Sequence, residues 1–278
     1  MDKDLNQNYN FSVLLSICDL DNDDYFDISL SSIFQNSIQP FEIIIVVNGR
    51  INDKKEKILN TYKSKCINLN ICRLNNLSNF ATALNYGLKF INTNWVMRQD
   101  PDDISTKYRF EKIMNKIKIG FDICGSNMIE NSLLYEGDKY LKKVPKNHND
   151  ILNYLKSKNP FCHPTVCINY ALLKKFNYPD LPLKEDYGLW SLILKEKDVT
   201  THNIQEPLVE TCNSSNQINR RGGIKHFHLE LNLQKTLLKH QHISIPRFIF
   251  NLFFRGLLLC MPNNILRIIY KFNRITVY

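Results

Sequence analysis

Two short, almost unbroken apolar runs stand near the start of the chain, at residues 11–17 and 42–47. Both are rich in β-branched residues. Such runs are typical of central parallel strands that are buried on both faces. Between them, apolar residues recur at helical spacing from Phe26 to Phe34, and Pro40 closes the connection.

The same plan of helix and strand repeats twice more. Asn52 or Asp53 can cap the next helix, and alternating apolar residues at 67–71 follow it as a strand. A helical stripe over 81–91 then leads to a strand at 95–97, which ends directly before an acidic turn. Strands and helices that alternate in this way predict an α/β domain with a Rossmann-like, mainly parallel central sheet flanked by helices. Ligands of such domains bind at the carboxyl ends of the strands.

The second half of the chain continues the pattern and then changes character. Residues 121–126 and 165–168 are expected to form strands, and residues 185–195 a helix. From residue 231 the sequence becomes helical, rich in Leu, Phe and Ile, and interrupted by two prolines, Pro246 and Pro262. We therefore predict a main domain over 1–230 and a C-terminal helical extension over 231–278.

The net charge of +9 is unevenly distributed along the chain. No acidic residue follows Glu230, whereas seven cations do: Lys235, Lys239, Arg247, Arg255, Arg267, Lys271 and Arg274. The main domain is therefore nearly neutral and the extension is cationic. Basic residues gathered in an apolar tail, rather than among exposed aromatic residues on a sheet, disfavour nucleic-acid binding.

The eight cysteines lie mostly in apolar stretches and never form a Cys-x-x-Cys pair, which argues against structural zinc and against a redox motif. Buried, reduced thiols are expected instead. The polar N-terminus lacks the apolar core of a signal peptide, and no segment has the roughly 18 consecutive apolar residues needed to span a bilayer. We expect a cytoplasmic protein, one that can work at the inner face of the cytoplasmic membrane.

The acidic turn places Asp100, Asp102 and Asp103 within four residues, directly after an apolar strand. Carboxylate oxygens are hard ligands that suit Mg²⁺ or Mn²⁺. A metal held there can neutralise the charge that develops on a leaving phosphate. The alternative is a solvated turn or a helix N-cap, because Asp-rich turns often precede helices.

The order of sequence blocks resembles the family-2 inverting glycosyltransferases of the GT-A fold over most of the chain. The blocks are residues 12–16, 29–39, 42–49, 83–88, 97–104, 109–111, 159–166 and 185–190. Residues 220–223, Arg-Arg-Gly-Gly, resemble a segment of a bacterial branch of that family, which makes surface polysaccharides such as amylovoran. The resemblance implies a nucleotide diphosphate sugar as donor and a glycan or lipid-linked acceptor.

The resemblance also assigns roles to the acidic residues. It implies that Asp100 lies near the ribose or sugar, that Asp102 binds Mn²⁺ or Mg²⁺, and that Asp186 is the general base. A base is needed there because a sugar hydroxyl is a poor nucleophile until its proton is removed. Glu185 is expected on the acceptor side. The alternative for the Glu185-Asp186 pair is an acidic first turn that stabilises the helix dipole.

Other candidates have less certain roles. Asn48 stands where many relatives carry an acidic residue that contacts the nucleotide base, so it is expected to bind the donor through a neutral contact. For His163 two roles stay open, acceptor binding and a structural role. For Arg98 and Arg109 the two roles are contact with the donor and structural ion pairs with nearby aspartates. Arg221 belongs to a basic segment that could close over the diphosphate, since arginine binds phosphate through paired hydrogen bonds.

Residues 246–274 are too apolar for an ordinary surface helix and too interrupted by Asn251 and Arg255 to cross a membrane. Aliphatic and basic residues mixed in this way are expected of helices that lie against anionic lipid. The alternative is that these helices pack on the main domain or on a second subunit.

The leading hypothesis is a metal-dependent hexosyltransferase that builds a bacterial surface glycan. The second is a non-catalytic sugar-nucleotide-binding or membrane-surface module on the same fold, which would be expected to lack Asp102 or Asp186. A nucleotidyltransferase is disfavoured because residues 18–24 are acidic and contain no glycine to cradle a triphosphate.

Overall fold

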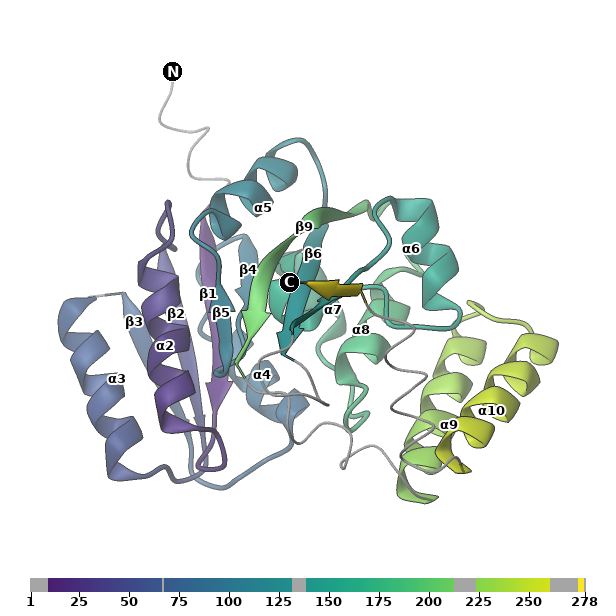
Figure 1. The fold of residues 1–278 in the computed structure, drawn as a ribbon, viewed down its shortest axis with the longest axis horizontal. Helices are drawn as coiled ribbons and strands as arrows, with labels where there is room; N and C mark the ends of the chain where they lie inside the picture. The colour runs from purple at the N-terminus through teal and green to yellow at the C-terminus, as the bar shows by residue number, and fades with distance from the viewer. Residues whose placement is uncertain (1–9, 67, 132–138, 213–223, 261–274, 278) are drawn as a thin grey trace.

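Strands and helices alternate through the first half of the chain (Figure 1). The computed structural model describes residues 10–66, 68–131, 139–212, 224–260 and 275–277. Its elements are β1 (Phe11–Ile17), α2 (Asp23–Phe34), β2 (Glu42–Asn48), α3 (Asp53–Lys65), β3 (Leu69–Leu74), α4 (Phe80–Leu88), β4 (Trp95–Arg98), β5 (Asp103–Ser105), α5 (Arg109–Lys118), β6 (Ile123–Asn131), β7 (Lys139–Lys142), α6 (His148–Leu155), the 3-10 turn η1 (His163–Thr165), β8 (Cys167–Asn169), α7 (Tyr170–Phe176), α8 (Glu185–Ile193), β9 (Thr201–Thr211), α9 (Ile224–Lys239), α10 (Ile245–Cys260) and β10 (Ile275–Val277).

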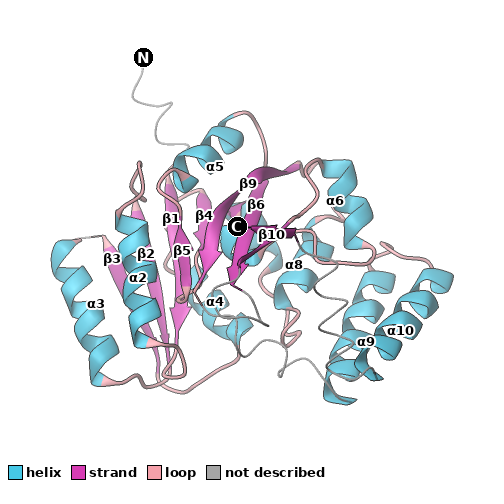
Figure 2. Cartoon of the chain, viewed as in Figure 1, coloured by secondary structure: helices cyan, strands magenta, loops and turns pink. Residues whose placement is uncertain are grey.

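The strands form one sheet in the order β10-β7-β6-β8-β4-β1-β2-β3, and β9 pairs with both β6 and β5 (Figure 2). Strands β3, β2, β1 and β4 are parallel to one another. Beyond them β8 runs antiparallel between β4 and β6. The predicted Rossmann-like sheet flanked by helices is therefore confirmed. Because β1, β2 and β4 point the same way, their carboxyl ends meet at one edge, where the acidic turn lies.

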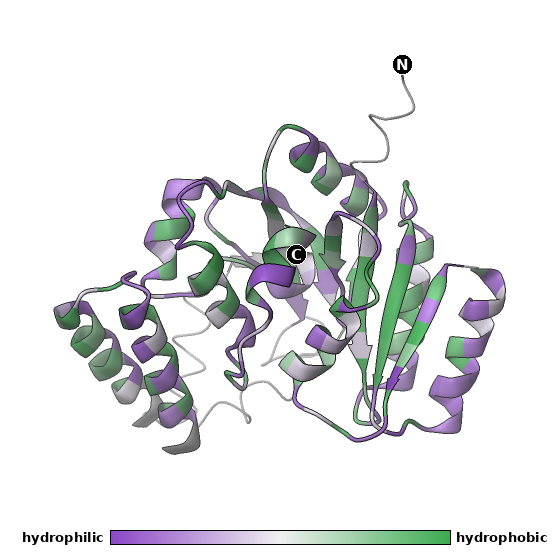
Figure 3. Cartoon of the chain, turned by 180° about the vertical axis from the view of Figure 1, so that it is seen from behind, coloured by the Kyte–Doolittle hydropathy of each residue, from purple (hydrophilic) through white to green (hydrophobic). Residues whose placement is uncertain are grey.

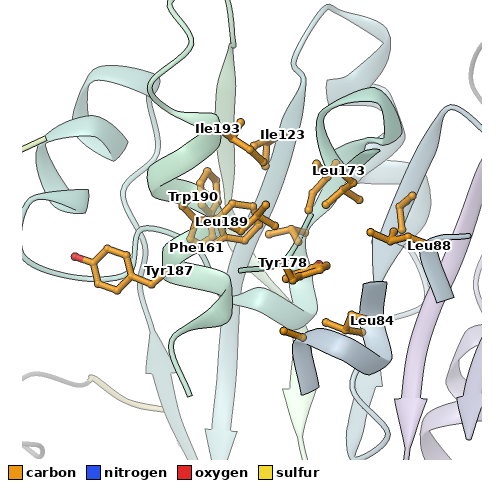
Figure 4. Packing of buried hydrophobic residues seen from close by; sticks show 14 of the residues in the cluster. Leu84, Leu88, Ile123, Phe161, Leu173, Tyr178, Tyr187, Leu189, Trp190 and Ile193 are labelled. Carbon is orange, nitrogen blue, oxygen red and sulfur yellow. The ribbon is translucent and has the colours of Figure 1, made fainter. Parts of the chain in front are cut away.

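Successive residues of β1 pack into two different cores. Val13 and Leu15 join a cluster with Phe110 of α5, on the face that also receives α2 and α3. Leu14 joins the opposite cluster, which includes Trp190 of α8 (Figure 4). Every residue of β1 is buried. Burial on both faces explains why this strand is apolar along most of its length, as the colouring of the central strands shows (Figure 3).

Helix α4 packs closely against the sheet because one of its turns carries Gly87. A Cβ atom at this position would lie 2.6 Å from Leu14 Cδ1 of β1 and 2.6 Å from Val46 Cγ2 of β2. Asparagine caps begin several of the helices, and the predicted cap at Asn52 is confirmed, since its side chain accepts a hydrogen bond from the Lys55 amide.

Three details differ from the sequence-based expectations. The predicted strand over 165–168 is instead the turn η1 followed by β8, because the Thr165 side chain donates a hydrogen bond to the Cys162 carbonyl and the Thr165 amide bonds to that carbonyl too. Strands β5, β7, β9 and β10 were not predicted. Pro246 does not interrupt a helix but lies in the first turn of α10, where its missing N–H is harmless. Pro262 lies outside the described residues.

The α9 and α10 helices lie side by side, at the end of the molecule far from α3 (Figure 1). They join the main domain through Glu230, whose side chain is only 5% exposed and pairs with Lys184 and with Arg255. Leu233 and Leu237 of α9 are fully buried in the core. Helix α9 begins at Ile224 and so runs through the predicted domain boundary, and the division into domains stays a prediction.

No helix within the described part of the chain is long and apolar enough to cross a membrane.

Candidate active site

The acidic turn connects β4 to β5 and is held from both sides. The Ser29 hydroxyl of α2 donates to the Asp100 carbonyl at 2.9 Å, and the Cys212 amide, just after β9, donates to the Asp102 carbonyl at 2.8 Å. The Asp103 amide closes the turn on the Asp100 carbonyl. The side chains of Asp100 and Asp102 are partly exposed, whereas Asp103 is buried.

Arg98 lies fully buried behind the turn. Its guanidinium forms an ion pair with the Asp100 carboxylate and donates to the carbonyls of Leu14 and Gln99. Because this guanidinium has no exposed surface, it cannot contact a bound sugar-nucleotide donor. The contacts therefore favour the structural ion pair among the two roles that the sequence left open, and Arg98 fixes the orientation of Asp100.

Arg109 is buried in the same way beneath the turn. It donates to the Ser105 hydroxyl at 2.7 Å, to the Gln99 side chain, and to the carbonyls of Arg98 and Pro164. Burial lowers the pKa of Arg109 to about 10, so it remains a cation at neutral pH. It too acts as an internal brace.

The carboxylates of the turn repel one another. The pKa of Asp103 is raised well above its ordinary value, chiefly by burial and then by the charges of Asp100 and Asp102. A divalent cation would relieve this repulsion, and carboxylate oxygens are suitable ligands for Mn²⁺ or Mg²⁺. Within the described ranges, no group of three or more His, Cys, Asp or Glu side chains is arranged to hold a metal alone. A cation bound at Asp100 and Asp102 would therefore need further ligands from outside these side chains.

Asp186 lies in the first turn of α8 and is held by a residue from another segment. Its Oδ2 atom accepts a hydrogen bond of 2.5 Å from Asn159 Nδ2, and its Oδ1 atom accepts one from the Tyr187 amide. Burial raises the pKa of Asp186, and these two hydrogen bonds act in the opposite direction. A carboxylate with a raised pKa is a stronger base than one in water.

Glu185 is buried beside it, and its Oε2 atom has no hydrogen-bond partner. Burial raises its pKa from 4.5 to about 7, and the charges of Asp186 and Asp100 add to the increase. The acidic turn and α8 are linked through buried side chains, since Arg98 pairs with Asp100 and donates to His163, whose ring packs on Trp190 of α8. An acidic residue can stabilise a helix dipole while it is exposed to water and has no partner from another segment. The helix-dipole alternative therefore does not explain why Glu185 is buried or why Asn159 bonds to Asp186.

Asn48, which was expected to contact the donor, is bonded to protein in the structure, and its contact with the donor stays a prediction. At the end of β2 it is 6% exposed, and its side-chain amide both donates to the Ser78 carbonyl at 2.9 Å and accepts from the Ser78 amide at 2.8 Å. These bonds tie β2 to the loop before α4. The geometry favours a structural brace over contact with a nucleotide base.

His163 lies in a buried aromatic cluster with the rings of Phe80, Tyr178 and Trp190. Its Nε2 atom accepts a hydrogen bond from Arg98 Nε, and Tyr178 Oη lies 3.1 Å from the same nitrogen. Burial and the Arg98 charge lower the pKa of His163 well below its usual value, so the ring stays neutral. These contacts favour the structural role over acceptor binding.

Arg221 lies outside the described residues, so its expected contact with the diphosphate stays a prediction. Asn159 stood in one of the sequence blocks, but its bond to Asp186 was not predicted. Nothing in the local pattern shows it, because the two residues meet only when the loop before η1 folds against the start of α8.

A mainly parallel sheet with carboxylates after β4, and a second carboxylate pair at the start of α8, is the arrangement expected of a glycosyltransferase of the GT-A fold. The model of the family described as "Glycosyl transferase family 2" matches residues 20–175, which is more than half of the chain. The chain belongs to this family.

Individual relatives extend over nearly the whole chain. It is 32% identical to the UDP-Gal:alpha-D-GlcNAc-diphosphoundecaprenol beta-1,3-galactosyltransferase of Escherichia coli, over 94% of this chain and 95% of the relative. It is 25% identical to the amylovoran biosynthesis glycosyltransferase AmsE of Erwinia amylovora, over 95% and 99%. The expected likeness to enzymes of bacterial surface polysaccharides is thus confirmed.

Solved structures confirm the fold. The structure of S. aureus TarS 1-349 in complex with UDP-GlcNAc superposes with a TM-score of 0.64 at 18% identity, over 82% of this chain and 66% of that one. This chain covers 39% of the longer TarS structure. At this level of identity the likeness concerns the fold alone.

Proposed function

We propose that this glycosyltransferase moves a hexose or hexosamine, with inversion, from a UDP-sugar to a glycan or lipid-linked acceptor, and that Asp186 is its general base. The observation that carries the proposal is the position of Asp186. Asn159 fixes its carboxylate, which lies beside Glu185 in the first turn of α8. A base must be held in a defined position to remove a proton from an attacking hydroxyl.

In the proposed reaction, the Asp186 carboxylate takes the proton from an acceptor hydroxyl as its oxygen attacks the anomeric carbon. The new glycosidic bond forms as the bond to the nucleotide diphosphate breaks on the opposite side, so the configuration inverts in a single displacement. Partial burial helps the base, because the raised pKa of Asp186 brings it closer to the operating pH.

Asp102 would hold Mn²⁺ or Mg²⁺, and Asp100 would contact the donor beside it. A bound divalent ion supplies positive charge to the leaving diphosphate. Arg98 supports this arrangement by keeping Asp100 in one orientation through their buried ion pair. The alternative function, a non-catalytic sugar-nucleotide-binding or membrane-surface module, has less support because the chain carries both Asp102 and Asp186, the proposed metal ligand and base.

The donor and acceptor follow from the relatives. The name of the E. coli relative includes UDP-Gal and a sugar carried on diphosphoundecaprenol, and TarS was solved with UDP-GlcNAc. We therefore infer a UDP-sugar as donor, a lipid-linked glycan as acceptor, and a working place at the inner face of the cytoplasmic membrane. A thermal-shift screen of UDP, GDP, dTDP and their sugars with Mn²⁺ tests the nucleotide; stabilisation by GDP alone would contradict it.

The mechanism is tested with two isosteric variants. Asp186→Asn is expected to bind UDP with Mn²⁺ as well as the parent protein but to lose about 10²- to 10⁴-fold in kcat, which is the range of general base catalysis. Asp102→Asn is expected to lose Mn²⁺-dependent UDP binding, measured by calorimetry. The matched control is Asp150→Asn, an exposed carboxylate in the first turn of α6. An active Asp186→Asn variant would exclude this residue as the base.

A further inference from the structure

Helix α10 turns its large apolar side chains outward. Six of them are 46–67% exposed, and they form what we call the α10 apolar face: Ile245, Ile249, Phe250, Phe253, Phe254 and Leu257. The rings of Phe250 and Phe254 lie 4.5 Å apart between centroids, so the face is continuous along the helix. Single exposed apolar residues are common on proteins, but a row of six on one helix calls for a covering surface.

The inward side of the same helix carries polar contacts beside Phe248, which packs against the core. Asn251 is 5% exposed and donates to the Lys156 carbonyl at 2.8 Å and to the Gln234 side chain at 2.9 Å. Arg255 pairs with Glu230 and donates to the Ser157 carbonyl. An ordinary surface helix packs its apolar stripe inward and its polar side toward water. In α10 six large apolar side chains face out instead, and the polar contacts of Asn251 and Arg255 fix this orientation.

The charges around this face have one sign. From Phe227 to Leu257 the exposed cations of the two helices include Lys235, Lys239 and Arg247, and the only acidic residue, Glu230, is buried and already paired. The Arg247 guanidinium lies 5.5 Å from the centre of the Phe250 ring, at the border of the apolar face. Aromatic and aliphatic residues bordered by cations complement the boundary between acyl chains and anionic headgroups.

We propose that the α10 apolar face is a membrane-docking surface, which inserts into the headgroup region of an anionic bilayer. A second copy of the chain fits less well. A symmetric contact through this face would bring Arg247 of both copies together, and within the described residues neither α9 nor α10 has an exposed carboxylate to neutralise it. The proposal rests on the proposed function in one respect, since a lipid-linked acceptor gives an enzyme reason to lie on the membrane.

Vesicle co-sedimentation of the full chain tests the proposal. The test variant carries Ile249→Gln with Phe253→Gln, which keeps a good helix former at two exposed positions. Its matched control carries Ile119→Gln with Phe41→Gln, two exposed apolar residues of the main domain, 69% and 48% exposed. The vesicles are phosphatidylcholine, with or without phosphatidylglycerol. Thermal melting and Mn²⁺-dependent UDP binding report separately on folding and on the active site.

The parent chain and the control are expected to bind anionic vesicles equally and neutral vesicles more weakly. The test variant should bind at least about tenfold more weakly, because two large apolar side chains no longer enter the bilayer. Arg247→Gln should cost about fivefold on anionic vesicles only. UDP binding should be equal in all of them.

Equal vesicle binding by the test variant and its control would overturn the proposal. The proposal would also be overturned if the parent chain did not bind vesicles but formed a dimer, and the test variant did not. The α10 apolar face would then be a contact between two copies of the chain. Light scattering without vesicles measures this. Failure of the proposed function, by contrast, would appear as a parent chain that transfers no sugar, or as an active Asp186→Asn variant, with vesicle binding unchanged.

Discussion

Burial of the Glu185 carboxyl makes the stability of this protein depend on pH in a way that can be measured. The carboxyl is 8% exposed, and one of its oxygens has no partner. Burial is the main reason that its pKa rises from 4.5 to about 7. Glu185→Gln keeps the shape of the side chain and removes the titration, so it isolates this effect.

The sign and size follow from proton linkage. With a folded pKa above the unfolded value, Glu185 binds more protons in the folded state, so its contribution to stability falls as pH rises from about 4.5 to about 7. At about 1.4 kcal/mol per pKa unit, the full loss is about 3 kcal/mol above pH 7. Part of this loss of stability is already present at pH 5. Glu185→Gln should therefore raise the free energy of unfolding by about 2 kcal/mol more at pH 8 than at pH 5.

Urea unfolding in EDTA at pH 5 and pH 8, followed by circular dichroism, measures this difference. The control is Glu206→Gln, whose side chain is 61% exposed on β9 and which should change stability about equally at the two pH values. If Glu185→Gln also changed stability equally at both, the carboxyl would not be buried as described, and the argument from desolvation would fail.

Three further substitutions test the packing and the site. Gly87→Ala should lose about 1–3 kcal/mol of stability in urea unfolding, because its Cβ would press on two sheet side chains; no loss would show that α4 can shift. Asn159→Ala should lower kcat about tenfold and move the acidic limb of the kcat/KM profile to higher pH, because the Asp186 carboxylate loses a hydrogen bond that stabilises its anion. An unchanged pH profile would show that Asn159 does not position Asp186. Arg98→Met should cost about 3 kcal/mol in thermal or urea unfolding, and a neutral result would place the guanidinium in water.

Much of the fold could be predicted from local pattern. The unbroken apolar run of β1 indicates burial on both faces, and the structure confirms it. The cap at Asn52 and the acidic turn after β4 were equally visible, because a cap and a turn depend on neighbouring residues. The short strands β5 and β7 were not, since their pairing partners are distant in sequence and their own residues carry little periodicity.

The roles of the polar residues near the turn needed the tertiary structure. The sequence could not choose between donor contact and an internal ion pair for Arg98, because burial of a guanidinium depends on what packs around it. The structure surrounds it with Asp100, His163 and two carbonyls. Asn48 likewise faces Ser78 instead of an open surface. The sequence supplies such side chains, and the fold decides whether they face ligand or protein.

The C-terminal helices show the same division most clearly. Composition alone determined that the segment after Glu230 is apolar, basic and free of acidic residues. It could not say which side of α10 packs inward, because apolar and polar residues both recur at helical spacing there. The buried bonds of Asn251 and Arg255 decided it, since an unpaired buried amide or cation is costlier than an exposed phenylalanine. Those bonds turn the aromatic side of the helix away from the protein.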